Sequence, residues 1–203
     1  MQTSHLFADI RIPAERPHCG GARRLAELDD DTLRSLLRQE GFAGWTELRG
    51  DVCHWHRELD FQPPSATPDV GRLVRHGDDS LIEEGVHVPY VEEWERVAAG
   101  NDPVACRLVD ADGTAASRIA SLVAVGDFFL FAVGRIRAMP PATSLEALVS
   151  AKRPSRAELI ELLDMEISFG LRRGGKVPWE VRLSTLPFRE GRPLELGGMR
   201  LAG

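Results

Sequence analysis

Short apolar segments separated by turn residues recur along the chain, and this spacing constrains the fold more than any other feature. Eleven segments have the length and composition of β-strands. They cover Leu6–Ile12, Phe42–Arg49, Asp51–Phe61, Val70–Arg75, Ser80–Val86, Pro89–Val97, Ala105–Asp110, Ser117–Val125, Phe128–Arg135, Met165–Arg172 and Glu180–Pro187. Between such segments, Asp112-Gly113 and Gly126-Asp127 tolerate the positive φ that two-residue hairpins require. This pattern predicts an antiparallel sandwich or barrel rather than βαβ units.

Three segments carry helix signals instead. Asp30–Gln39 has an Asp-rich start, leucines on one face and Gly41 as a stop. A capping-box pattern precedes two further helical segments: Thr143 with Glu146 at the start of Ser144–Ser150, and Ser155 with Glu158 ahead of the next segment. We therefore predict one mainly β domain over residues 1–203, an antiparallel barrel of roughly ten strands with two or three short helices. The helical connection near residues 138–164 is a potential point of subdivision.

Composition and charge restrict the function classes. The chain has 203 residues, 43% of them hydrophobic, and a net charge of -6, so nucleic acid and anionic membranes are not expected as main partners. No apolar run approaches the roughly 20 residues of a membrane span, and MQTSHLFADIRIP lacks a secretory pattern. The three cysteines lack CxxC spacing, which is typical of free thiols in a reducing compartment. We expect a cytoplasmic protein.

The segment Asp51–Phe61 (DVCHWHRELDF) sorts its side chains sharply if it is a strand. Alternation places Cys53, Trp55, Arg57, Leu59 and Phe61 on one face and His54, His56, Glu58 and Asp60 on the other. The first face is apolar apart from one guanidinium, and we predict that it lines an enclosed space. The second face fits a solvated surface or a metal site.

Aromatic and charged residues share a face in other segments too. These faces hold Phe7, Asp9 and Arg11; Tyr90, Glu92, Trp94 and Arg96; and Phe129, Phe131, Val133 and Arg135. Such faces favour a partly polar lumen of the size that holds one small molecule. A guanidinium inside it needs a partner, which Asp9, Glu92 or an anionic ligand group would supply. The alternative is that the arginines extend to solvent from a barrel rim.

The leading functional expectation is therefore a binding protein. We expect it to hold a small, largely apolar molecule with a polar or anionic group, and to use no cofactor. The predicted ligand contacts are Arg11, Trp55, Arg57, Tyr90 and Trp94. Two alternatives stay open: an enzyme in the same cavity, and an interaction module whose lumen is filled. A homodimer is compatible with each of them.

The enzyme alternative has two forms. In the first, Asp9 or Glu92 acts as a base in a cofactor-free isomerase or cyclase; we interpret the doublet Glu83–Glu84 as a solvated hairpin edge. In the second, His54 or His56 holds a divalent metal or haem. The HxH pair is shared with cupins, but the glycine spacing and the later ligands of that family do not follow. No GxGxxG, P-loop or GxSxG motif is present, and Cys53 and His54 fall on opposite faces.

A set of ordered motifs resembles a family of uncharacterised bacterial proteins, distantly similar to a fungal family of casein-kinase-interacting proteins. The motifs are LFADIRIP, GFAG, CHWHRELDFQPP, DVGR, LIEEGVHVPYVEEW, LVAVGDFF and WEVRLSTLP, which together span about Leu6 to Pro187. The resemblance implies a calycin fold, an antiparallel barrel of the lipocalin type, and it implies no activity or catalytic residue. The lipocalin GxW motif is not reproduced, since Gly44 and Trp45 are contiguous.

Overall fold

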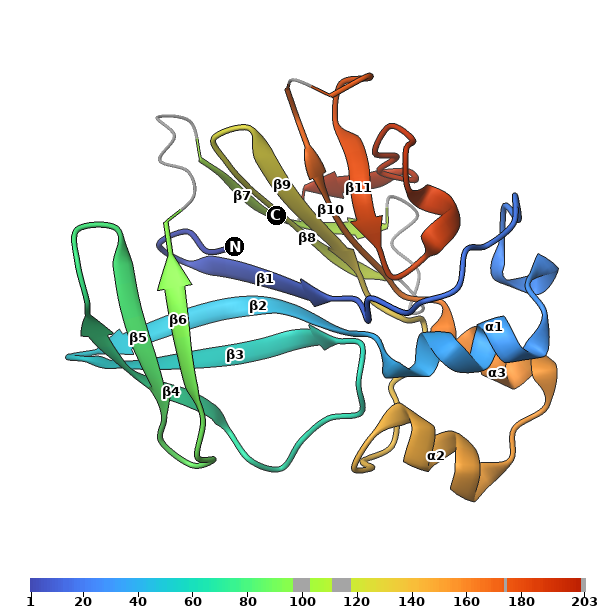
Figure 1. The fold of residues 1–203 in the computed structure, drawn as a ribbon, viewed down its shortest axis with the longest axis horizontal. Helices are drawn as coiled ribbons and strands as arrows, with labels where there is room; N and C mark the ends of the chain where they lie inside the picture. Colours follow the sequence, from blue (N-terminus) through green and yellow to red (C-terminus); the bar gives the residue numbers. More distant parts are fainter. Residues whose placement is uncertain (97–102, 111–117, 174, 202–203) are drawn as a thin grey trace.

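The computed structural model describes residues 1–96, 103–110, 118–173 and 175–201, and its strands form two antiparallel sheets (Figure 1). The first sheet has the order β1-β2-β3-β4-β5-β6, with β1 (Leu6–Arg11), β2 (Glu40–Arg49), β3 (Val52–Asp60), β4 (Asp69–Arg75), β5 (Ser80–Gly85) and β6 (Val91–Glu95). The second has the order β11-β10-β9-β8-β7-β12, with β7 (Val104–Asp110), β8 (Ile119–Val125), β9 (Phe128–Val133), β10 (Glu166–Leu171), β11 (Glu180–Ser184) and β12 (Met199–Leu201). The predicted mainly β, antiparallel fold is confirmed.

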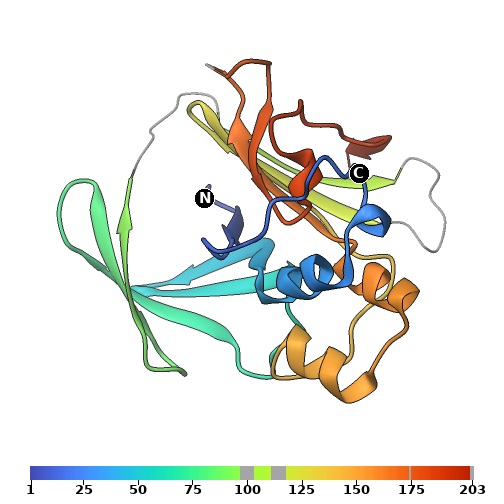
Figure 2. The ribbon, with the colours of Figure 1, turned by 45° about the vertical axis from the view of Figure 1, so that its right-hand side comes forward.

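The first sheet curls into a half-barrel. Figures 1 and 2 show β4, β5 and β6 turning back over β2 and β3, so that the sheet has a concave face. β1 and β6 are its two edges and are not neighbours in the sheet. An ion pair between Arg11 on β1 and Glu92 on β6, 3.1 Å long, crosses the seam between these edges. The barrel curvature is thus present, but the wall divides into two sheets instead of closing on itself.

The second sheet packs against the convex side of the half-barrel. β1 contacts β8, β9 and β10, and Leu6 and Ala8 of β1 belong to the main core. Strand alternation then turns Phe7 and Asp9 toward the concave side. The side chains of β1 therefore serve the core on one face and the concave surface on the other.

Three short helices close one end of this core. They are α1 (Asp30–Ser35), α2 (Leu145–Lys152) and α3 (Arg156–Leu163), of which the last two connect β9 to β10. Each has a side-chain cap: Asp29 accepts from the amide of Thr32, Ser144 from that of Ala147, and Ser155 forms a capping box with Glu158. Single 3-10 turns lie at Leu25–Glu27, Leu36–Arg38 and Pro187–Arg189.

The turn chemistry is confirmed where the structure describes it. Gly126 has a φ of 58° in the hairpin that pairs Val125 with Phe128. Asp112-Gly113 lies outside the described residues. The three-residue strand β12 was not predicted, because it is too short to show any alternation. Among the described residues, no helix has the length and apolar character needed to cross a membrane.

Candidate functional site

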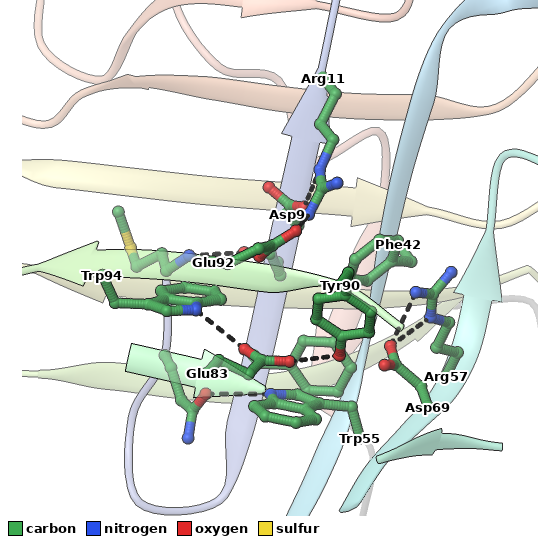
Figure 3. Close-up of a pocket in the computed structure, with 14 residues that line it drawn as sticks. Asp9, Arg11, Phe42, Trp55, Arg57, Asp69, Glu83, Tyr90, Glu92 and Trp94 are labelled. Atoms are coloured by element: carbon green, nitrogen blue, oxygen red, sulfur yellow. Dashed lines mark hydrogen bonds and ion pairs between the residues drawn. The ribbon is translucent and has the colours of Figure 1, made fainter. Parts of the chain in front are cut away.

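A cavity of about 300 Å³ lies on the concave face of the half-barrel (Figure 3). Its lining comes from β1 to β6 and from the residues just before β1. The lining residues are Met1, Gln2, Phe7, Ala8, Asp9, Arg11, Phe42, Trp55, Arg57, Asp69, Glu83, Tyr90, Glu92 and Trp94. The structure thus brings together all five predicted ligand contacts and both predicted carboxylate bases. They come from strands far apart in the sequence, and the curl of the sheet is what makes them neighbours.

Small residues in register leave room for the cavity. Cys53, Gly71 and Gly85 lie side by side on β3, β4 and β5. A Cβ on Gly71 would lie 2.6 Å from Cγ of Glu83, and one on Gly85 would lie 2.5 Å from the ring of Tyr90. These two glycines therefore make the space into which Glu83 and Tyr90 fold.

A β-bulge in β3 decides which side chains face the cavity. Ala43 pairs with Leu59 while Gly44 pairs with Arg57, so Glu58 is an extra residue on β3. The bulge reverses the alternation. Trp55 packs with Phe7 and Cys53 on the concave side, whereas Leu59 and Phe61 belong to the main core on the other side. The prediction that all five residues share one face is therefore wrong for Leu59 and Phe61.

The bulge also supplies Arg57 with its partners. Beyond the bulge Asp60 lies on the concave side, and its carboxylate accepts from Arg57 Nη1 at 3.1 Å. Asp69 on β4 accepts from Nε and Nη2 of the same guanidinium, at 2.9 and 2.7 Å. The guanidinium lies 3.6 Å from the centroid of the Phe42 ring, a cation–π distance. Simple alternation had placed Asp60 on the face opposite Arg57. That prediction is wrong because of the same bulge.

The second arginine of the cavity is paired as well. Arg11 Nε donates to Asp9 at 2.8 Å, and Nη2 donates to Glu92 at 3.1 Å (Figure 3). The sequence predicts that a guanidinium in the cavity pairs with Asp9, with Glu92 or with an anionic ligand group, and Arg11 pairs with the first two. Both predicted bases thus lie in ion pairs with one guanidinium.

Glu83 is the residue that sequence reasoning missed. Its exposed fraction is 3%, so the interpretation of this glutamate as a solvated hairpin residue is wrong, while Glu84 is exposed as expected. Figure 3 shows the carboxylate between two aromatic donors: Tyr90 Oη donates to Oε1 at 2.5 Å and Trp94 Nε1 to Oε2 at 2.8 Å. The missed signal is the spacing of Tyr90, just before β6, and Trp94 in β6, which places both rings on the side of a glutamate of β5.

Burial changes the acid–base properties of this cluster. Loss of hydration raises the pKa of Glu83, and the nearby carboxylate of Glu92, its cross-strand neighbour, raises it further. The pKa of Tyr90 is also raised, by burial and by its hydrogen bond to Glu83. Tyr90 thus stays a hydrogen-bond donor at any ordinary pH. Burial raises the pKa of the Cys53 thiol to about 11, which leaves it protonated and weakly nucleophilic.

The raised pKa of Glu83 predicts a pH-dependent effect of Glu83→Gln on stability. Between the unfolded value of 4.5 and the higher folded value, the native state binds more protons than the unfolded state. The contribution of Glu83 to stability therefore falls as pH rises through this window. Glutamine does not titrate, so the variant does not lose this contribution as pH rises. The free energy of unfolding of Glu83→Gln minus that of the wild type should therefore increase from pH 4.5 to pH 8.

Urea unfolding at several pH values measures this difference. Glu84→Gln is the matched control, because Glu84 is the next residue on the strand and its side chain is exposed; its difference should show no such increase. A Glu83→Gln difference that stays constant or decreases with pH would contradict the prediction.

The two histidines lie away from the cavity. His56 stacks on Trp45 with 3.7 Å between ring centroids, and His54 lies 6.3 Å from His56. Trp45 packs against the main core, on the side opposite Trp55. Within the described residues, no group of three or more His, Cys, Asp or Glu side chains is arranged to hold a metal ion. Glu47 lies 3.6 Å from His56 Nε2, but within the described part of the chain these side chains do not form a metal-binding arrangement with His54.

A second, larger cavity of about 940 Å³ adjoins the first. The two share Met1, Gln2, Trp55 and Trp94 in their linings. Its lining includes apolar side chains of both sheets, among them Leu73, Leu81, Val125, Phe128 and Phe169, and also six charged residues: Asp51, Arg75, Asp78, Asp79, Glu95 and Arg96. The indole of Trp55 donates to Gln2 Oε1 at 3.2 Å, on the wall that both cavities share. The exposed surface of the second cavity is more apolar than that of the first.

Comparison of the chain with protein-family models, with curated proteins and with solved structures found no match. The function is therefore inferred from the geometry and chemistry of the cavity itself.

Proposed function

We propose that this protein binds a small, largely apolar molecule that carries a polar group, with the polar group in the cavity of the half-barrel. One observation carries the proposal: a buried carboxylate faces a cavity with aromatic walls and accepts hydrogen bonds from Tyr90 and Trp94 alone among the described residues. Binding sites typically combine apolar walls with a few oriented polar groups and occupy about 300 to 1,000 Å³. The adjoining, more apolar cavity would receive the remainder of the ligand.

The sequence resemblance is consistent with this proposal. The barrel curvature and the polar cavity on the concave face are features that a calycin-like protein would use to hold a ligand. We keep the calycin relationship as part of the proposal, together with a reducing, cytoplasmic setting, which the three free thiols support.

A fragment screen by protein-observed NMR tests the proposal. Hits should shift the indole N–H resonances of Trp55 and Trp94, which line the cavity, and leave those of Trp45 and Trp179 in place. Trp94→Leu should weaken the best hit about tenfold, because it removes a wall of the site and a hydrogen bond to Glu83.

Trp45→Leu is the control, since Trp45 lies on the same sheet but on its opposite face; the affinity should change less than about twofold. Hits that perturb Trp45 and Trp179 instead, or no hits at all, would overturn the proposal. The second outcome would favour an interaction module without a ligand.

The enzyme alternative is favoured by one observation, the burial of the Glu83 carboxyl in the cavity wall, which raises its pKa. Asp9 and Glu92 are held in ion pairs with Arg11, so Glu83 replaces them as the candidate acid or base. Conversion of a bound ligand during the NMR measurement, lost in Glu83→Gln, would support this alternative over simple binding.

A further inference from the structure

The partners of Glu83 leave part of its acceptor capacity unused. A carboxylate offers about four lone-pair positions, and the two aromatic donors occupy one on each oxygen. Among the described residues, no lysine, arginine or histidine forms an ion pair with Glu83, although its exposed fraction is only 3%. A buried carboxylate normally has a cationic partner, because its desolvation is costly.

The arginines of the cavity are not available to Glu83. Arg57 is engaged by Asp60 and Asp69, and Arg11 by Asp9 and Glu92. An anionic ligand group would have to compete with these carboxylates for a guanidinium. The amino group of Met1 donates to the carbonyl of Ala8 at 2.7 Å, and burial lowers its pKa, which reduces its charge.

The whole cavity has an excess of negative charge. Its lining has four carboxylates but only two guanidinium groups. The aromatic rings add to this, since the faces of Trp, Tyr and Phe carry a negative quadrupole that attracts cations. The aromatic lining residues are Phe7, Phe42, Trp55, Tyr90 and Trp94. Carboxylate and ring faces together form the environment that binds organic ammonium ions.

We propose that the ligand is an organic cation, whose ammonium group contacts Glu83 between Tyr90 and Trp94 and whose apolar part extends toward the adjoining, more apolar cavity. This inference rests on the proposed function and adds the sign of the ligand's charge. The ammonium group supplies the partner that Glu83 lacks, and its N–H groups fill the free lone pairs of the carboxylate.

The charge preference can be measured in the wild-type protein with matched probes. Benzylamine, benzyl alcohol and benzoate have similar shape and differ in charge. The series is run alongside a fragment library composed of matched amines, alcohols and acids. We expect the amines to bind at least about tenfold more tightly than the alcohols, the size of one charge-assisted hydrogen bond, and the acids to bind least.

Glu83→Gln locates the preference. The variant should lose the advantage of benzylamine over benzyl alcohol, so that their affinities differ by less than about twofold. Glu84→Gln, the exposed neighbour, should keep the full preference. An equal preference in both variants would overturn the assignment to Glu83.

The outcomes separate this inference from the proposed function. If alcohols bind as tightly as amines, or acids bind best, the inference is wrong while binding in the cavity stands. If no member of any charge class binds, both are wrong. Because the charge series uses the wild type, it holds even if Glu83→Gln does not fold.

Discussion

Replacing Arg135 by alanine is expected to destabilise the protein by about 3 kcal/mol or more. The guanidinium donates to three carbonyl oxygens, those of Asp60 at 2.9 Å, Phe61 at 2.7 Å and Leu162 at 2.5 Å. It thereby connects the end of β3 with the last turn of α3. Burial lowers the pKa of Arg135 to about 10, which leaves it charged at neutral pH. The alanine variant would leave carbonyls without a donor in a place that water reaches poorly.

Urea unfolding at pH 7 measures this loss. Arg137→Ala is the control, because Arg137 is 84% exposed in its side chain and its ion pair with Glu161 is 3.4 Å long; it should change stability by less than about 0.5 kcal/mol. Arg135→Lys should recover only part of the loss, since an ammonium lacks the planar fork that reaches three oxygens. A loss below about 1 kcal/mol in Arg135→Ala would mean that the carbonyls find other partners.

Gly44→Ala is expected to cost about 3 kcal/mol or more and to weaken ligand binding with it. A Cβ at this position would lie 1.9 Å from the carbonyl oxygen of His56. Because that atom belongs to the backbone, the bulge in β3 would have to open. The bulge orients both Arg57 and Asp60, so its loss would disturb the cavity.

Thermal unfolding and titration with the best ligand from the fragment screen measure the two effects. Gly77→Ala is the matched control: its added Cβ would meet only the hydroxyl of Ser80, at 3.0 Å, which can rotate away. A Gly44→Ala variant with wild-type stability and affinity would show that the bulge does not fix the site.

The fold was predictable to the extent that local patterns determine it. Each predicted strand corresponds to a strand of the structure. Short alternating segments between turn residues can be recognised from the local sequence alone, without knowledge of the rest of the chain. The helices were predictable for the same reason, from the box of Ser155 and Glu158 and from the leucines after Asp30. At α2 the predicted helix is present, but its cap is Ser144 and not Thr143. The division into two sheets was not, since it depends on which strands pair, and pairing is a long-range property.

The candidate site shows the same limit. Alternation placed Trp55, Tyr90 and Trp94 on faces that line the cavity. It failed at Leu59 and Asp60, where one inserted residue reverses the pattern. The interpretation of Glu83 as a solvated hairpin residue failed for another reason: its burial depends on Gly71 and Gly85 lying opposite each other on adjacent strands. No local signal reports such a register.

The seam of the half-barrel bears on how a guest molecule would exchange with solution. A closed wall admits a ligand only through an end, whereas here two edge strands face each other across the pair of Arg11 and Glu92, whose side chains are 48% and 35% exposed. Dissolved salt screens an exposed ion pair. Because β1 and β6 are not neighbours in the sheet, breaking this pair breaks no backbone hydrogen bonds between strands. The seam would therefore serve a bound ligand as a lateral entrance, one that opens more readily as ionic strength rises.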